Sequence, residues 1–137
     1  TMPGGHTKNL FLKDRNGRYF LLCALGESKI RLNQLHKPLR CGRLSFGSEA
    51  DLFSCLGVRP GSVSLFCLIN DRNQEITLVL DRALLESDPV NFHPLGNDAT
   101  TAISQAGMRR FVQHWDGPVW SADFAGEDIE AEPLVWN

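Results

Sequence analysis

Four short motifs that mark common enzyme classes are missing from this 137-residue sequence. It contains no GxxxxGK loop for phosphates, no GxGxxG turn for dinucleotides, no GxSxG elbow for a serine nucleophile and no HExxH helix for zinc. The sequence therefore argues against the enzymes that depend on those motifs. Any catalytic residues have to be sought in less familiar patterns.

Cysteine is scarce, and its spacing does not fit a metal site. Cys23, Cys41, Cys55 and Cys67 lie in separate segments, with no CxxC pair and no closely spaced histidine. Structural zinc sites use such closely spaced ligands. We therefore expect reduced thiols in the core, and neither a metal nor another cofactor.

Long hydrophobic runs are missing as well. No apolar stretch approaches the ~20 residues that a membrane span requires. The chain does not open with the basic, apolar and cleavage-site pattern of a secretory signal. We expect a protein of the cytoplasm that has no membrane partner.

Charge is nearly balanced overall, with a formal net charge of −2, but it is unevenly distributed. Residues 1–59 contain ten Lys or Arg against four Asp or Glu, whereas residues 121–137 contain five acidic residues and no Lys or Arg. A basic front half can attract a polyanion, although dispersed basic side chains are also common on surfaces that bind nothing. Charge alone does not separate these interpretations.

The hydrophobic pattern predicts a β-hairpin near the start of the chain. Apolar-rich strands over residues 9–13 and 19–25 flank a turn that contains Asn16-Gly17, a pair that favours tight hairpin turns. Further short strands are predicted over residues 76–80, 90–93 and 100–104.

Spacing and capping signals predict three helices. Apolar residues recur at approximately helical spacing over residues 30–39, and Ser48 is placed to cap a helix over residues 49–56. Residues 43–46 are interpreted as the connector between these two helices. A third helix is predicted over residues 105–115.

These elements do not alternate regularly between strand and helix, so repeated βαβ units are not expected. We predict a single α+β domain with a mixed, largely antiparallel sheet and helices packed against it. The domain is expected to cover residues 1–120, and residues 121–137 are expected to form an acidic C-terminal tail.

Three polar, glycine-containing segments stand out from their apolar surroundings. They read Gly-Gly-His-Thr-Lys-Asn at 4–9, Arg-Pro-Gly-Ser-Val-Ser at 59–64 and Asn-Phe-His-Pro-Leu-Gly-Asn at 91–97, with a Leu-Asp pair at 80–81. In content and order they resemble the prolyl-tRNA editing domain family, which includes the editing insertion of bacterial prolyl-tRNA synthetases and free-standing proteins that act in trans. The resemblance spans about residues 4–115. Family members commonly carry an N-terminal helical and strand segment ahead of the Lys-Asn strand, and that segment is largely missing here.

The resemblance implies a fold, a site and a substrate. The fold would be that of the editing domain associated with prolyl-tRNA synthetase. Lys8, Gly61, Asp81 and His93 match the positions of the family's site, and Asn9 adjoins them as a pocket residue. The Lys-Asn-Leu-Phe-Leu sequence, with Phe-His-Pro later, is similar to the branch that deacylates alanyl-tRNA(Pro) rather than cysteinyl-tRNA(Pro).

Hydrolysis of an aminoacyl ester requires few groups, because the ester is already activated. It mainly needs a positioned water and stabilisation of the developing oxyanion. The backbone N–H groups of Gly61 and Ser62 can donate to the ester carbonyl or to the terminal phosphate. Lys8 can supply positive charge to the same groups, and either His93 or a neighbouring substrate hydroxyl can activate the water.

Each of these residues also has a purely structural interpretation. Lys8 can be a solvent-facing strand residue, and His93 can cap a strand beside Pro94. Gly61 can simply complete a Pro-Gly turn, and Asp81 can cap a helix that begins near Arg82.

The hypothesis is a free-standing aminoacyl-tRNA deacylase that removes alanine from tRNA(Pro). Its partner is tRNA, prolyl-tRNA synthetase is a further candidate partner, and no DNA is expected. Two alternatives stay open: a deacylase for cysteinyl-tRNA(Pro) or another small aminoacyl-tRNA, and a non-catalytic module that binds tRNA or a synthetase. The cations that could contact the tRNA are Lys13, Arg15, Lys29, Arg31, Lys37, Arg40, Arg43 and Arg59.

Overall fold

The computed structural model describes residues 5–59, 63–86, 90–92 and 101–135 of the chain. The strands are β1 (Gly5–Asp14), β2 (Tyr19–Leu25), β3 (Leu44–Phe46), β4 (Ile76–Asp81), β5 (Val90–Phe92), β6 (Thr101–Ile103), β7 (Val119–Asp123) and β8 (Glu130–Pro133). The helices are α1 (Leu32–Leu39), α2 (Glu49–Leu56), the 3-10 helix η2 (Leu65–Asn70), α3 (Arg82–Leu85) and α4 (Gln105–Trp115). Within this part of the chain, no helix has the length and apolar character needed to cross a membrane.

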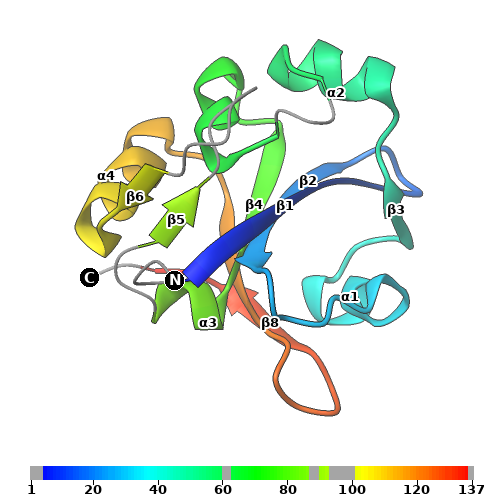
Figure 1. Cartoon of the computed structure of the whole chain (residues 1–137). Coiled ribbons are helices and arrows are strands. Elements are labelled where there is room, and N and C mark those ends of the chain that lie inside the picture. The colour runs from blue at the N-terminus through cyan, green and yellow to red at the C-terminus, as the bar shows by residue number, and fades with distance from the viewer. Residues whose placement is uncertain (1–4, 60–62, 87–89, 93–100, 136–137) are drawn as a thin grey trace.

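All of the described strands join one mixed sheet in the order β6-β5-β1-β2-β4-β7-β8, and β3 pairs with β1 beside this path. The β1–β2, β1–β3, β5–β6 and β7–β8 pairs are antiparallel, whereas β1–β5, β2–β4 and β4–β7 are parallel. Figure 1 shows β1 crossing the whole molecule, from β5 at one end to β3 at the other. The prediction of an α+β domain with a mixed, largely antiparallel sheet is confirmed.

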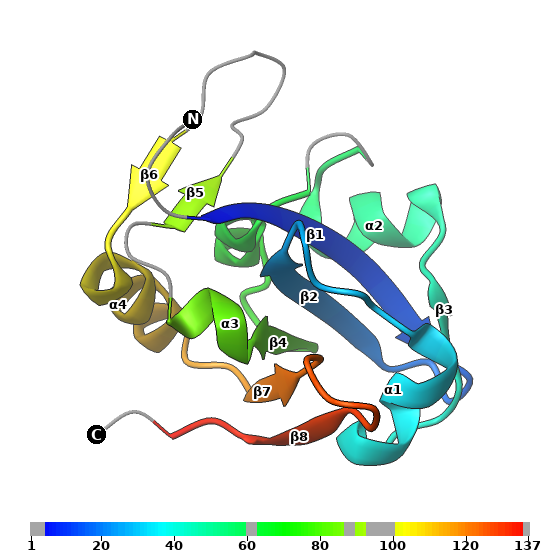
Figure 2. The same ribbon diagram turned by 60° about the horizontal axis from the view of Figure 1, so that its bottom comes forward.

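Both faces of the sheet are covered, which explains why β2 and β4 are apolar at almost every position. Leu21 and Cys23 of β2 pack with α2, η2 and α4 on one face. Phe20 and Leu22 pack with α1 on the other face. Figure 2 shows α1 at the lower right, whereas α2 lies at the upper right and α4 at the left. Successive residues of a strand point to opposite faces, so the sheet separates two hydrophobic cores.

Local sequence signals account for the hairpin and for the ends of the helices. The β1–β2 hairpin forms as predicted, and Gly17 in its turn has a φ of 87°, which favours glycine. The side chains of Ser48 and Ser104 accept hydrogen bonds from the first turns of α2 and α4, each at 3.0 Å. Gly57 ends α2 with a φ of 69°. These caps confirm the predicted helices over 49–56 and 105–115.

Two predictions about the chain's organisation differ from the structure. The residues interpreted as a connector at 43–46 include β3, which pairs with the end of β1. The segment expected to be an acidic tail from residue 121 instead contributes most of β7 and all of β8, and β7 pairs in parallel with β4. Phe124 and Ile129 are buried in the core on the α1 side. The domain therefore extends to residue 133 at least, beyond the predicted boundary at 120.

The cysteines are free thiols, as expected, but only two of them are core residues. Cys23 and Cys67 are buried, whereas Cys41 and Cys55 are partly exposed. Burial raises the pKa of the Cys23 thiol, and it raises the pKa of Cys41 to about 11. A raised pKa leaves little thiolate at neutral pH, so these two thiols are poor nucleophiles.

Candidate functional site

Lys8 lies near the start of β1, and its ammonium group is held by main-chain oxygens. Residues of β1 alternate between faces, which places Lys8 on the α1 side of the sheet with Leu10 and Leu12. Its Nζ donates to the carbonyl oxygen of Gly26 at 3.2 Å and to that of Ser28 at 2.5 Å. Lys8 is therefore not a freely moving surface side chain, although it is only partly buried.

Asp81 is at the end of β4 and is almost fully buried, with 1% of its surface exposed. One carboxylate oxygen accepts from the backbone N–H of Leu25 at 3.1 Å and from the hydroxyl of Ser28. The other accepts from the backbone N–H of Ala83 at 3.0 Å and so caps α3. The capping interpretation of Asp81 is confirmed, and all of these partners are internal. A direct contact between Asp81 and a substrate stays a prediction.

Ser28 joins the two predicted site residues. It closes the turn of residues 25–28, which follows β2, with a hydrogen bond from its backbone N–H to the carbonyl of Leu25 at 3.0 Å. Its hydroxyl binds Asp81, and its carbonyl receives Lys8. The buried carboxylate therefore fixes the turn, and the turn fixes the ammonium. The sequence analysis did not identify Ser28, whose visible signal was a short polar run, residues 26–29, directly after an apolar strand.

Asn9 faces the opposite side of the sheet from Lys8. It lies opposite Cys23 in the hairpin register, and Cys23 in turn lies beside Leu80 of β4. Its side-chain oxygen Oδ1 is buried and has no hydrogen-bond partner among the described residues. A buried acceptor without a partner is costly to folding, and such groups are often explained by a functional role.

Within the described part of the chain, the edge of β1 beside these two residues has no strand partner. On the side away from β2, β1 pairs with β5 only at Gly5 and His6 and with β3 only at residues 12–14. Among the described strands, none pairs with residues 8–10 on that edge. Main-chain groups at an open sheet edge can form hydrogen bonds with a ligand.

A shallow hollow next to Asp81 is a poor place for an anionic substrate. It has a volume of about 430 Å³, and its lining residues include Glu27, Asp81 and Asp123, with Lys29 as the cation. Excess negative charge repels a phosphate-bearing ligand. The open edge of β1 is the better approach for such a ligand.

The remaining predicted site residues, Gly61, Ser62 and His93, lie outside the described residues. The described chain ends at Arg59 before the first two and resumes at Val63. His93 directly follows β5, whose Val90 and Asn91 pair with Gly5 and His6 of β1. Their predicted roles therefore stay predictions. Within the described ranges there is no group of three or more His, Cys, Asp or Glu side chains that could hold a metal ion.

Comparison with known proteins identifies the family. A sequence model described as "Aminoacyl-tRNA editing domain" matches residues 2–111. The chain belongs to this family of aminoacyl-tRNA editing domains.

Two curated relatives agree with this assignment. The chain is 36% identical over 114 residues to "Prolyl-tRNA synthetase associated domain-containing protein 1" of Danio rerio, covering 82% of this chain and 62% of that protein. It is also 36% identical over 107 residues to "Prolyl-tRNA editing protein ProX" of Acetoanaerobium sticklandii, covering 77% of this chain and 65% of the relative. The chain thus spans a little under two thirds of the length of each relative.

A solved structure agrees with the fold. The crystal structure of the hypothetical protein APE2540 matches 96% of this chain and 77% of its own, with a TM-score of 0.64 and 20% sequence identity. At this identity the match supports the α+β fold and no finer statement.

Proposed function

We propose that the chain hydrolyses mischarged Ala-tRNA(Pro) in trans, releasing alanine and free tRNA. Water attacks the carbonyl carbon of the ester, the bond to the ribose oxygen breaks, and that oxygen takes up a proton. Membership of the editing-domain family supports the reaction class. The choice of alanine rests on the Lys-Asn-Leu-Phe-Leu sequence of β1 and on the later Phe-His-Pro sequence.

The position of Lys8 is the observation that carries this proposal. A lysine ammonium has three N–H donors, and two of them are used by the carbonyl groups of Gly26 and Ser28. Neither the third donor nor the positive charge is taken up by a described residue, so both can act on a substrate at the start of β1. A charge held in advance stabilises a developing oxyanion, or the terminal phosphate, without further reorganisation.

Asn9 would bind a hydrogen-bond donor of the aminoacylated ribose. An aminoacyl ester on a ribose carries an ammonium and a neighbouring hydroxyl, and both are hydrogen-bond donors. The buried Oδ1 of Asn9 is an acceptor that lacks such a donor. Because Lys8 and Asn9 face opposite sides of β1, we propose that the aminoacyl group lies across the open edge of this strand.

The residues outside the described ranges complete the proposal. The backbone N–H groups of Gly61 and Ser62 would donate to the ester carbonyl or the terminal phosphate. His93 or the neighbouring hydroxyl of the substrate would activate the water. Asp81 acts as a positioning residue, because it holds the turn that holds Lys8. Prolyl-tRNA synthetase remains a candidate partner.

The test is a deacylation assay with alanyl-, cysteinyl- and prolyl-tRNA(Pro), with and without a chelator. The proposal predicts chelator-independent loss of alanine and little loss of proline. Preferential release of cysteine would instead favour cysteinyl-tRNA(Pro) as the substrate. Binding of tRNA without hydrolysis of any ester would favour a non-catalytic module. The Lys8→Ala variant should abolish release of alanine if Lys8 has the proposed role.

A further inference from the structure

A buried carboxylate organises the end of the β1–β2 hairpin that lies far from Lys8. Asp14 is 2% exposed. One of its oxygens accepts from the backbone N–H groups of Asn16 and Arg18, at 3.0 and 2.8 Å, and the other accepts from that of Gly42 at 3.0 Å. Asp14 therefore fastens the hairpin turn to the loop between α1 and β3.

This junction brings arginines from separate segments together. The backbone N–H of Arg15 donates to the carbonyl of Arg43 at 3.0 Å. The side chain of Arg15 covers Gly42 so closely that a Cβ added there would lie 2.5 Å from its Cγ. Arg40 ends α1 two residues before Gly42, with a φ of 56°. We call the surface formed by Arg15, Arg18, Arg40 and Arg43 the arginine platform.

The charges of the platform are exposed, and no ion pair with a described residue neutralises them. All four side chains are exposed, and within the described residues none of them forms an ion pair. The Asp14 carboxylate at the junction attracts Arg18, but it is buried and accepts its hydrogen bonds from backbone N–H groups. Like charges repel, so a group of guanidinium ions without ion-pair partners lowers the stability of the fold, and a bound polyanion would relieve this repulsion.

Other cations of the first half of the chain have internal partners. Lys13 pairs with Asp51 at 3.5 Å. Arg31 donates to the carbonyl oxygens of Gly126 and Glu127 at 3.0 and 2.7 Å, and so anchors the loop between β7 and β8. Lys13 and Arg31 were among the candidate tRNA-binding cations, but unlike the platform arginines they have partners within the protein.

We propose that the arginine platform binds backbone phosphates of the tRNA body while the aminoacylated 3′ end lies at Lys8. This proposal rests on the function proposed above. Lys8 lies in β1, and Arg15 directly follows Asp14, the last residue of this strand. The two positions are seven residue steps apart, which corresponds to roughly 23 Å at the usual rise per residue of an extended chain. Strand β1 therefore sets the distance between Lys8 and the arginine platform (Figure 1).

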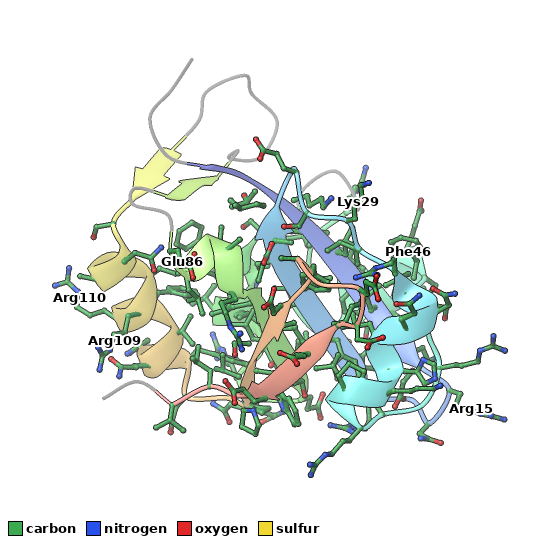
Figure 3. All side chains as sticks on the ribbon, turned by 90° about the horizontal axis from the view of Figure 1, so that it is seen from below. Arg15, Lys29, Phe46, Glu86, Arg109 and Arg110 are labelled. Carbon is green, nitrogen blue, oxygen red and sulfur yellow. The ribbon has the colours of Figure 1, made fainter. Side chains whose placement is uncertain are left out.

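The chemistry of the platform favours RNA phosphate as its ligand. Guanidinium groups bind phosphate oxygens in a bidentate manner and are less strongly hydrated than ammonium groups. Figure 3 shows Arg15 extending into solvent at one side of the molecule, while Arg109 and Arg110 lie on α4 at the other side. The platform and α4 can therefore be tested separately.

The experiment compares two double variants that remove the same charge. Arg40→Gln with Arg43→Gln alters the platform, whereas Arg72→Gln with Arg110→Gln removes two exposed arginines outside it. Binding of uncharged tRNA(Pro) is measured over a range of salt concentrations. The platform variant should bind roughly tenfold more weakly, and its salt dependence should fall by about one unit of slope for each lost phosphate contact. The control variant should match the wild type.

A short alanylated 3′ fragment, used as a second substrate, distinguishes a role in binding the tRNA body from a role in hydrolysis. The platform variant should hydrolyse full-length Ala-tRNA(Pro) less efficiently, but it should hydrolyse a short alanylated 3′ fragment that cannot reach the platform at the wild-type rate. Unchanged tRNA affinity and salt slope would overturn the platform, as would an equal loss on both substrates. If the wild type hydrolyses neither substrate but its tRNA binding depends on Arg40 and Arg43, the proposed reaction fails and the platform stands.

Discussion

Replacing Asp81 with Asn should lower both the stability of the fold and the rate of catalysis, because this buried carboxylate holds the turn that holds Lys8. Asn retains one oxygen, which can still cap α3 through Ala83. Its amide nitrogen would then face the N–H of Leu25 and the hydroxyl of Ser28, which now donate to a carboxylate oxygen. The Ser28 hydroxyl can rotate, but the Leu25 N–H cannot, so a buried donor loses its acceptor.

The expected cost follows from these contacts. Hydrogen bonds to a charged group contribute ~1.5–3 kcal/mol each, and a buried unsatisfied donor costs a similar amount. Asp81→Asn should therefore lower the free energy of unfolding by about 3 kcal/mol. Asp123→Asn is the matched control, because Asp123 ends the neighbouring strand but is only partly buried and pairs with Arg82 at 3.4 Å. Its loss should cost no more than about 1 kcal/mol.

The assay combines urea unfolding with deacylation well below the unfolding midpoint. Because the 25–28 turn carries both carbonyl groups that hold Lys8, Asp81→Asn should lower kcat/KM by roughly ten- to a hundredfold while the protein remains folded. Equal unfolding free energies for Asp81→Asn and the wild type would refute the idea that this carboxylate holds the turn. Normal catalysis in a destabilised variant would refute its connection to Lys8.

Two further predictions concern stability. Burial would raise the pKa of Asp14, but hydrogen bonds from the backbone N–H groups of Arg18, Gly42 and Asn16 outweigh it and hold the pKa below its ordinary value of 3.8. Asp14 therefore stabilises the fold above that pH, and this stabilisation is lost as the pH falls further. The free energy of unfolding of the wild type should exceed that of Asp14→Asn by about 2 kcal/mol at pH 7, and the difference should shrink in unfolding curves measured at acid pH. A difference that does not change with pH would contradict this role of Asp14. Ser104→Ala should cost ~1 kcal/mol, because the hydroxyl caps α4; an unchanged urea midpoint would show that the cap is not formed in solution.

The parts of the fold that follow from local signals could be predicted from the sequence. The Asn16-Gly17 turn, the Ser48 and Ser104 caps and the ending of α2 at Gly57 depend on residues within a few positions of one another. Such signals act through local hydrogen bonds and backbone preferences, which do not depend on the rest of the chain. β2, α2 and α4 were therefore predicted with their observed bounds, whereas β1 begins at Gly5, four residues before its predicted start.

The acidic segment was misplaced because composition is a poor guide to strand pairing. β7 and β8 carry several carboxylates, yet Ser121 and Ala122 are buried. The partner of β7 is β4, about 40 residues earlier in the chain, and a parallel pair of this kind has no turn signal. Only the tertiary pairing determines that this stretch is part of the sheet.

The candidate site also has features that the sequence predicts and features that depend on the tertiary structure. Lys8 and Asp81 could be singled out from motifs, but their connection through Ser28 depends on the parallel pairing of β2 and β4, which brings the ends of the two strands together. The separation of Lys8 and Asn9 onto opposite faces follows from the period of a strand. The open edge of β1 could not be predicted, since it depends on where β5 and β3 stop pairing.

The most direct test of this account is single-turnover hydrolysis of Ala-tRNA(Pro) by the wild type, Lys8→Ala and Lys8→Arg. The account predicts that Lys8→Ala loses at least a hundredfold in rate, as is typical when a preorganised donor to an oxyanion is removed. Lys8→Arg should retain only part of the wild-type rate, because a planar guanidinium cannot reproduce the contacts of the ammonium with Gly26 and Ser28. A wild-type rate in Lys8→Ala would contradict the central claim that the ammonium held by the 25–28 turn acts on the ester.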